Sequence, residues 1–300
     1  MNAPSKTAFI SIVGQANVGK SSLLNRLLGA KIAIVSNKPQ TTRTRIMGVL
    51  TTDDNVQLVF TDTPGFHRPR TKLGEKMVQA VSDSIAGVDA CLFVCEAAGT
   101  GLSDTEAQLL KKLRAANVPL LLAINKIDLL QDKSVLAARI ASLAPLAAFR
   151  AVVPVSARDG DGLDALLQEL KACAYASAHF FPDDTLTDQP ERVLAAEMIR
   201  EKLLRLLSHE IPHGTAVSVE RMREREDAPI LDIDAVIYCE KESHKGIIIG
   251  KGGATLKKAA TLARQDMERF FGCKVNLQCR VKVKEGWRNR EGLIHAFGLD

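Results

Sequence analysis

The chain has 300 residues, of which 46% are hydrophobic and 25% are charged, a composition that excludes a disordered, collagen-like or disulfide-stapled protein. This length lies near the point where single cores split, so two domains are expected. The net charge of +5 is unevenly distributed, because residues 241–300 hold 13 Lys and Arg against 6 Asp and Glu. A basic final segment favours an anionic partner, with nucleic acid as the first candidate and a solvated basic surface as the alternative.

No apolar run is long enough to cross a membrane, and the first residues contain no hydrophobic signal region. The 6 cysteines are scattered, without a C-x-x-C pair. We therefore expect a reduced, cytoplasmic protein with free thiols.

Residues 1–178 alternate short apolar runs with helical periods, which predicts an α/β domain. The expected strands are 9–13, 56–61, 89–95, 119–125 and 151–155, and leucine-rich helical periods follow at 23–28, 109–113 and 163–170. Ser103 and Glu106 fit a capping box at the start of the second helix. This order predicts a mainly parallel sheet with helices on both faces and its ligand-binding loops along one edge.

Residues 179–191 (HFFPDDTLTDQPE) contain prolines and aspartates without an apolar period, and predict a linker. Residues 192–300 then form a second domain of α+β type. It is expected to contain a helix around 194–206, strands at 215–222 and 230–239, a helix at 256–270 and a strand at 275–283. Trp287 and Arg288 either dock the tail or contact RNA, and the sequence favours neither role.

Gly14-Gln-Ala-Asn-Val-Gly19-Lys20-Ser21 fits the phosphate-loop pattern and lies between a predicted strand and helix. Backbone N–H groups and the helix N-terminus would surround a diphosphate, while Lys20 would reach the β- and γ-phosphates and Ser21 would ligate Mg²⁺. The alternative is an ordinary glycine-rich turn. The residues predicted to bind here are Gly14, Gln15, Ala16, Asn17, Val18, Gly19, Lys20, Ser21 and Ser22.

A second motif, Asp62-Thr63-Pro64-Gly65, ends the next apolar strand. The Asp62 carboxylate would lie at this edge, opposite the phosphate loop. We therefore predict that Asp62 is a partner of Mg²⁺. Gly65 has no side chain, so its N–H could approach the γ-phosphate closely. His67, just beyond the motif, could touch phosphate or water, with a plain loop histidine as the alternative.

A third motif, Asn125-Lys126-Ile-Asp128, closes another strand and would choose the base. An aspartate accepts two parallel hydrogen bonds from guanine, which adenine cannot supply. Lys126 would lie along the base, and Asn125 would tie this loop to the phosphate loop. Ser156 and Ala157, after the last strand, would offer a backbone N–H to the guanine O6.

With these motifs in order, residues 8–175 resemble a GTPase domain of the translation-factor class. The resemblance implies a threonine ligand of Mg²⁺ in the loop Lys38-Pro-Gln-Thr41-Thr42-Arg43. It favours Thr42, with Thr41 as the second choice. Thr42 therefore joins Ser21 and Asp62 as a predicted metal ligand.

Two residues shape the expected mechanism. Phe66 stands where Ras-like enzymes carry a water-orienting glutamine, so slow intrinsic hydrolysis is expected. Asn17 resembles the asparagine that holds a monovalent cation in potassium-activated relatives, which suggests that K⁺ assists Mg²⁺; a simple turn residue is the alternative. The predicted catalytic residues are Lys20, Thr42, Gly65 and Asn17.

Ile247-Ile-Ile-Gly250-Lys251-Gly252-Gly253 matches the signature of a KH domain, whose G-x-x-G loop clamps about four nucleotides. The order of elements resembles the bacterial type II form, which implies that Ile247–Ile249 is helical and lies beneath the bases. The alternatives are a second nucleotide loop or a structural turn in a protein-binding domain. The predicted RNA-binding residues are Lys245, Ile247, Gly250, Lys251, Gly252, Gly253 and Lys257.

A GTPase domain followed by one KH domain resembles the bacterial Era-type GTPases. The resemblance implies a protein that binds the 3′ end of small-subunit (16S) ribosomal RNA and acts in 30S subunit assembly. We expect it to be a monomeric GTP/GDP switch. It also implies peripheral contact with the inner membrane. The rival classes are a phosphotransferase with an RNA-binding appendage and a GTP-sensing RNA-binding module without useful turnover.

Overall fold

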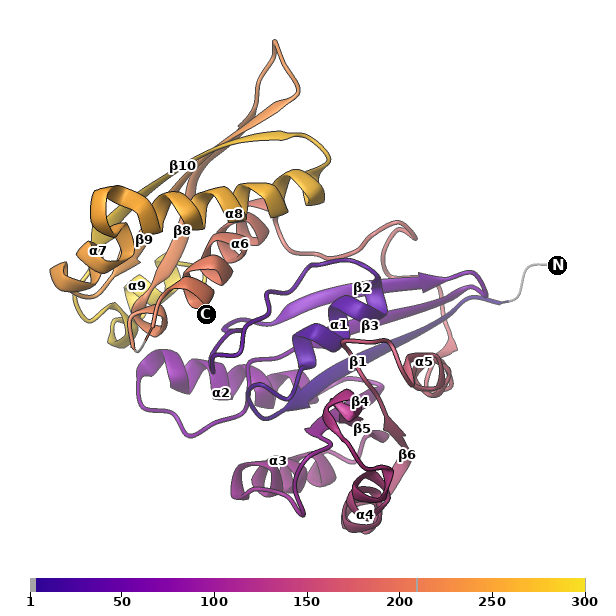
Figure 1. Ribbon diagram of the computed structural model, residues 1–300. Helices are drawn as coiled ribbons and strands as arrows, with labels where there is room; N and C mark the ends of the chain where they lie inside the picture. Colours follow the sequence, from indigo (N-terminus) through magenta and orange to yellow (C-terminus); the bar gives the residue numbers. More distant parts are fainter. Residues whose placement is uncertain (1–3, 209, 300) are drawn as a thin grey trace. The chain divides into compact units, whose positions relative to one another are not determined.

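The computed structural model describes residues 4–208 and 210–299, which divide by their internal contacts into two units. The first unit extends as far as Asp188. Two earlier stretches, Ile34–Thr41 and Thr71–Leu73, belong by their contacts to the second unit, which otherwise begins at Gln189. Figure 1 follows the chain through both units by colour.

The first unit is built on a mainly parallel sheet, as predicted. Its strands among the described residues are β1 (Lys6–Gly14), β2 (Ile46–Thr52), β3 (Val56–Asp62), β4 (Ala90–Glu96), β5 (Leu120–Asn125), β6 (Phe149–Pro154) and β7 (Tyr175–Ala176). The order is β2-β3-β1-β4-β5-β6, with the short β7 paired to β1. β2 and β7 run antiparallel to their neighbours. The sequence did not predict β2, because Gly48 interrupts its apolar run and the polar Thr51 and Thr52 end it.

Helices cover both faces of this sheet (Figure 1). They are α1 (Lys20–Leu28), α2 (Lys72–Ile85), α3 (Asp104–Ala115), α4 (Lys133–Leu143) and α5 (Leu163–Lys171), with short turns η1 (Ile127–Leu129) and η2 (Ala144–Leu146). α2, α3 and α4 bury apolar side chains in one cluster with β4 and β5. α1 and α5 pack on other strands, β1–β3 and β3 with β6 respectively.

The predicted capping box at the start of α3 is confirmed. The Glu106 N–H donates to the Ser103 Oγ at 3.2 Å, and the Ser103 N–H donates to the Glu106 carboxylate at 2.9 Å. Each residue thus satisfies a backbone donor that the helix itself leaves open. This fixes where the loop after β4 ends.

The segment expected as a linker, 179–191, is not a free connection for most of its length. Gln57 of β3 accepts hydrogen bonds from the N–H groups of Phe180 and Phe181 at 2.9 and 3.0 Å. The Val49 N–H of β2 donates to the Leu186 carbonyl at 2.9 Å. Residues 179–188 therefore belong to the first unit.

The second unit has the element order that the sequence predicted. It comprises α6 (Glu191–Leu206), η3 (Pro212–Gly214), β8 (Ala216–Glu224), β9 (Ile230–Cys239), α7 (Glu242–Ile249), η4 (Lys251–Gly253), α8 (Ala254–Phe271), β10 (Lys274–Val283), η5 (Trp287–Asn289) and α9 (Glu291–Ala296). The sheet order is β10-β9-β8, with β10 parallel and β8 antiparallel to β9. One core joins α6 and α8 to the sheet. Ile247–Ile249 is helical, as the resemblance implied.

Trp287 settles one alternative that the sequence left open. Its side chain is fully buried, and its indole N–H donates to the Gly214 carbonyl at 2.9 Å. Phe297 packs edge-on against it and stacks on Tyr238. Trp287 therefore docks the C-terminal segment onto the second unit. None of the helices described is both long and apolar enough to span a lipid bilayer.

Candidate functional site

The phosphate-loop motif lies where β1 ends and α1 begins. Lys20 is only 6% exposed, and its Nζ donates to the carbonyls of Gly14 and Gln15 at 3.1 and 3.0 Å. Burial lowers the pKa of Lys20 to about 8, and the nearby Asp62 carboxylate partly opposes this shift. The loop therefore holds a buried amine at the place where phosphates would lie.

Three oxygen-bearing side chains meet beside Lys20. The Ser21 Oγ donates to the Asp62 carboxylate at 2.6 Å and lies 2.9 Å from the Thr42 Oγ1. The Thr42 hydroxyl lies 3.5 Å from the same Asp62 oxygen. Thus the loop of Thr42, the phosphate loop and the end of β3 converge on one spot, as the sequence predicted for a metal site.

The chemistry of this cluster fits Mg²⁺. Hydroxyl and carboxylate oxygens are the ligands that this ion prefers. Asp62 is fully buried, and its Oδ1 has no hydrogen-bond partner among the described residues. Burial raises the pKa of Asp62, while Lys20, Ser21 and Thr42 act against that shift. A cation or its water shell would satisfy the open oxygen and remove the cost of the buried charge.

The turn at Gly65 abuts the phosphate loop directly. A Cβ on Gly65 would lie 2.5 Å from the Ala16 Cα, and the Phe66 N–H donates to the Gly14 carbonyl at 3.1 Å. The close approach of two backbones therefore requires the glycine. From the sequence, we expected a glycine here so that its N–H could approach the γ-phosphate. In the structure, contact with Ala16 is already enough to require a residue without a side chain at position 65.

Phe66 and His67 complete this turn. The Phe66 side chain is buried in the cluster beneath α2 and α3, so it does not face the phosphates. The His67 Nδ1 lies 2.8 Å from the Gly65 carbonyl and therefore donates to it. In this arrangement His67 supports the backbone of the turn, which favours the loop role over contact with phosphate.

Asn125 links the base loop to two other motifs. Its Nδ2 donates to the Val18 carbonyl at 2.8 Å, and its Oδ1 accepts from the Ala157 N–H at 3.0 Å. Lys126 adopts a left-handed backbone and its Nζ pairs with Glu96 at the end of β4. One amide thus holds together the loops that would surround a nucleoside.

The Asp128 carboxylate contacts two side chains. The Ser156 hydroxyl donates to its Oδ1 at 2.7 Å, and Arg158 lies 3.3 Å from its Oδ2. The Ser156 N–H donates to the Asp161 carbonyl at 2.9 Å, and the Ala157 N–H is engaged by Asn125. A guanine O6 therefore reaches one of the predicted N–H groups only if that donor is shared or released.

Sequence reasoning missed Glu96 and Arg158 as partners of the base loop. Glu96 ends β4, and Arg158 directly follows the Ser156-Ala157 motif. Position at the carboxyl edge of a parallel sheet was the available signal for Glu96. Arg158 is largely exposed at 67%, so it can leave Asp128 without disturbing the core.

Asn17 has a φ of 67°, in the left-handed region that asparagine tolerates better than most residues. This observation supports the turn role that the sequence left as an alternative.

The G-x-x-G loop joins α7 to α8 through η4. A Cβ on Gly250 would lie 2.3 Å from the Thr255 Oγ1, so the first turn of α8 itself requires this glycine. Of the predicted apolar floor, Ile247 is 51% exposed whereas Ile248 is fully buried in the core. Only Ile247 of these two can meet a ligand, which corrects the expectation for Ile248.

The basic residues of this loop face solvent. Lys251 and Lys257 are exposed, as is Gly252 between them. Lys245 is half-buried and lies 3.7 Å from Glu242 in the same helix. The loop therefore presents positive charge and open backbone on one stretch of surface.

Comparisons with known proteins match both units. A family model described as 50S ribosome-binding GTPase matches residues 9–126, and a KH-domain model matches residues 210–288. The GTPase Era of Clostridioides difficile is 48% identical over 98% of this chain and 99% of its own length. That of Ruminiclostridium cellulolyticum is also 48% identical, over 98% of this chain and 97% of its own length. The chain belongs to the GTPase Era family.

Solved structures of the Era family agree with the observed fold. One is a single-residue variant of Aquifex aeolicus Era bound to GDP.AlF4⁻, with a TM-score of 0.94 and 35% identity over 98% of this chain and 99% of that one. Another is Era in complex with MgGDPNP and nucleotides 1506–1542 of 16S ribosomal RNA, with a TM-score of 0.92, 35% identity and the same coverage. The chain is therefore a GTPase whose second unit is a KH domain.

Proposed function

We propose that the chain is a GTP-driven switch that binds Mg²⁺ with its nucleotide and small-subunit ribosomal RNA through its KH domain. The observation that carries this proposal is the meeting of Ser21, Thr42 and Asp62 beside the buried Lys20. The relative solved with MgGDPNP and a 16S rRNA fragment supports both halves of it.

Each site residue has a distinct proposed role. Lys20 gives up its carbonyl partners to reach the β- and γ-phosphates, and Ser21 and Thr42 turn their hydroxyls to the metal. Asp62 holds the metal through the water shell of the ion and orients the Ser21 hydroxyl. Bound Mg²⁺ supplies charge neutralisation at the phosphates during transfer to water.

Guanine selection is assigned to Asp128, with Lys126 along the base and Asn125 holding the loops together. The carboxylate of Asp128 accepts from the guanine N1–H and its exocyclic amine once Arg158 moves aside. Adenine offers no matching pair of donors, so the buried carboxylate would be left unpaired.

Hydrolysis is proposed to be slow without a partner, because Phe66 offers no group that could orient water. Gly65 donates its N–H to the γ-phosphate, and Lys20 neutralises the developing charge. Asn17 is proposed to hold K⁺ beside the phosphates. Hydrolysis rates in KCl and NaCl should differ, and Asn17→Ala should abolish the difference. Equal rates in the two salts would remove the K⁺ assignment.

The KH loop is proposed to clamp RNA near the 3′ end of 16S ribosomal RNA, in the course of 30S subunit assembly. Gly252 and Gly253 leave the backbone open, Lys251 and Lys257 add charge, and Ile247 packs under a base. Gly250 supports the loop, and Lys245 adds charge at its start. The basic balance of residues 241–300 supports an RNA partner.

Nucleotide selectivity is the decisive experiment. Calorimetric titration of the full chain with GDP, a GTP analogue and ATP, each with and without Mg²⁺, should show guanine preference and a Mg²⁺ requirement for the GTP analogue. Equal affinity for guanosine and adenosine nucleotides would refute the proposal. Release of free phosphate, without transfer to an acceptor, separates this function from a phosphotransferase.

Location and assembly are further parts of the proposal. We infer a monomer in the cytoplasm that touches the inner membrane peripherally through its basic surface. Sedimentation with anionic but not with zwitterionic vesicles, and its loss at high salt, is the expected result. Equal recovery with both kinds of vesicle would remove the membrane assignment.

A further inference from the structure

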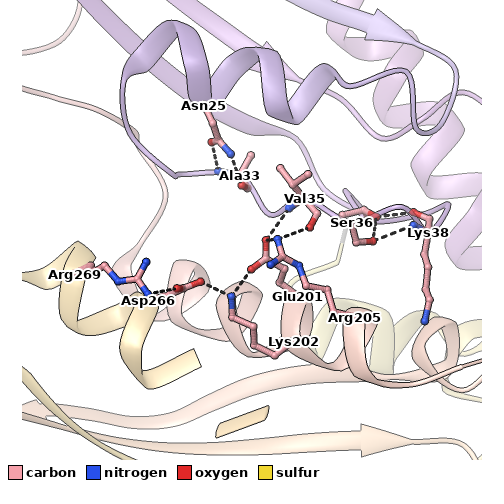
Figure 2. Close-up of polar contacts among 11 residues, drawn as sticks. Asn25, Ala33, Val35, Ser36, Lys38, Glu201, Lys202, Arg205, Asp266 and Arg269 are labelled. Carbon is pink, nitrogen blue, oxygen red and sulfur yellow. Dashed lines mark hydrogen bonds and ion pairs between the residues drawn. The ribbon is translucent and has the colours of Figure 1, made fainter. Parts of the chain in front are cut away.

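Residues Ile34–Thr41, which lie between α1 and β2 and lead into Thr42, belong by their contacts to the second unit. The preceding residue, Ala33, is still bound by α1, since the Asn25 amide contacts both its N–H and its carbonyl at 2.9 and 2.7 Å. Figure 2 shows the change of partner between Ala33 and Val35. The segment that ends at the predicted metal ligand therefore has its anchor on α6.

α6 forms hydrogen bonds with the start of this segment at Val35. The Glu201 Oε1 accepts from the Val35 N–H at 3.0 Å, and Arg205 donates to the Val35 carbonyl at 3.1 Å (Figure 2). Arg205 and Glu201 also pair with each other at 2.9 Å. Both backbone groups of one residue are thus bound by successive turns of a helix.

α6 also forms a hydrogen bond with the end of the segment, at Thr41. The Arg200 Nη2 donates to the Thr41 carbonyl, and the Glu197 carboxylate orients the same guanidinium at 2.5 and 2.7 Å. Lys38, between the two ends, donates to the Leu207 carbonyl. Arg200 is only 1% exposed and its Nη1 has no hydrogen-bond partner in the described residues. A buried arginine is costly to desolvate, and here the Glu197 carboxylate and the Thr41 carbonyl offset that cost.

The contacts of α6 with this segment continue into a network of paired charges. Glu201 is fully buried, and its second oxygen accepts from the Lys202 Nζ at 2.7 Å. Lys202 in turn pairs with Asp266 of α8, as Figure 2 shows. Glu201 also pairs with Arg205, so removing any one of these charges would take one ion pair from each of its partners.

We propose that Arg200 and Glu201 of the KH unit are positioning residues for the Thr42 hydroxyl. The Thr41 carbonyl and the Thr42 N–H belong to one planar peptide group, so Arg200 sets the orientation from which the Thr42 side chain extends. That side chain lies 2.9 Å from the Ser21 Oγ. This inference rests on the proposed role of Thr42 at Mg²⁺, and adds residues that orient the peptide group before it.

The consequence concerns GTP more than GDP. Mg²⁺ demands near-ideal geometry, and loops of this kind are ordered by the γ-phosphate and its metal. A displaced Thr42 should therefore cost affinity for the triphosphate, while the phosphate loop and Asp128 continue to hold the diphosphate. A general loss of stability would weaken both.

The test is a double-mutant cycle in the full chain between Arg200→Met and Thr42→Ala. Affinities for GDP and for the non-hydrolysable analogue GDPNP are measured in Mg²⁺. Arg200→Met should weaken GDPNP binding about tenfold, the effect of one lost charge-assisted hydrogen bond, and leave GDP binding within about twofold. The double variant should bind GDPNP no more weakly than Thr42→Ala alone.

Two further variants guard the result. Arg192→Met removes an exposed arginine from the same helix and should leave both affinities unchanged. Arg200→Lys keeps the charge and one donor, and should recover part of the lost GDPNP affinity. Thermal unfolding of each variant reports stability independently, and Arg200→Lys carries the cycle if the methionine variant does not fold.

The outcomes separate the inference from the proposed function. Additive losses in the double variant, or equal losses for GDP and GDPNP, would overturn the positioning role and leave the GTPase proposal intact. A Thr42→Ala protein that binds GDPNP like the parent would overturn the role of Thr42 at Mg²⁺, and this inference with it.

Discussion

Lys20 and Asp62 are both buried, and each shifts the ionisation of the other. Burial lowers the pKa of Lys20 to about 8, against an ordinary value of 10.5, and Asp62 only partly compensates. Without a ligand, the amine therefore begins to lose its proton just above neutral pH. Phosphate groups would bring negative charge to Lys20 and restore that proton.

Nucleotide binding should therefore take up protons above about pH 8. The free chain is partly deprotonated at Lys20 there and the bound chain is not, so affinity falls as pH rises through this range. Calorimetry of GDP at about pH 8.5, in two buffers of different ionisation enthalpy, measures the uptake. Guanosine, which shares the base but lacks phosphates, is the control and should show less uptake. Equal uptake for both ligands would contradict the assignment to Lys20.

Asp128→Asn should weaken GTP binding about 100-fold, because the amide oxygen can accept only one of the two hydrogen bonds, without the charge, and the amide N–H₂ faces the other guanine donor. The preference for GTP over ATP should shrink with it. Competition binding of both nucleotides checks this. Asp132→Asn, at the exposed start of α4, is the matched control and should bind like the parent. An unchanged GTP-to-ATP ratio in Asp128→Asn would exclude the base-selecting role.

At the scale of elements, the KH loop depends on how α8 begins. Gly250 has a φ of 76° and no room for a Cβ beside Thr255. The conformation of the loop is thus imposed by the protein before any RNA arrives. Within one motif, Gly250 is therefore required by packing, whereas Gly252 is exposed to a ligand.

Gly250→Ala should destabilise the second unit by about 1–3 kcal/mol through backbone strain and the clash with Thr255. Gly246→Ala is the control, because Gly246 lies in α7 and, apart from its chain neighbours and its own helix backbone, no described atom stands within 4 Å of its Cβ position. That variant should be as stable as the parent or more stable by about 0.5–1 kcal/mol. Denaturant unfolding measures both. Similar stability for the two variants would refute the packing role of Gly250.

At the scale of the whole molecule, nucleotide state and RNA binding should be coupled. Glu201 and Lys202 join the segment before Thr42 to Asp266 of α8, the helix that follows the G-x-x-G loop. A change at either end would alter the energy of a shared buried network.

The affinity for a 16S 3′-end oligonucleotide should therefore differ between the GDP and GDPNP states. By linkage, RNA should change the GDPNP affinity relative to GDP by the same factor. Fluorescence anisotropy measures the first and nucleotide titration the second, at one salt concentration. Equal RNA affinity in the two states would dispose of the coupling. Lys251→Ala should weaken RNA binding in both states without changing their ratio.

The sequence predicted the motifs well because each is a local pattern with a local cause. Gly19-Lys20-Ser21 and Asn125-Lys126-Ile-Asp128 need only the end of a strand and the loop after it. The partners of these motifs were not predictable in the same way, because Glu96 meets Lys126 only after the sheet has formed.

Other features depend on tertiary contacts that the hydrophobic pattern of the sequence does not indicate. β2 carries a glycine and no clean alternation, and it becomes a strand by pairing with β3. Residues 34–41 have no helical or strand period, and only the folded chain shows that Arg200 and Glu201 hold them. The sequence predicted Thr42 through family resemblance, but not what orients it.

The stretch around Leu186 has one more consequence, for how the first unit could be isolated. β2 is the outermost strand, and Leu186 and Thr187 occupy backbone groups of Val49 and Met47 along its free side. A fragment cut at 178 would leave a bare sheet margin that invites other chains to add to it, and aggregation should follow. A fragment continued to Asp188 carries its own cover and should stay dispersed.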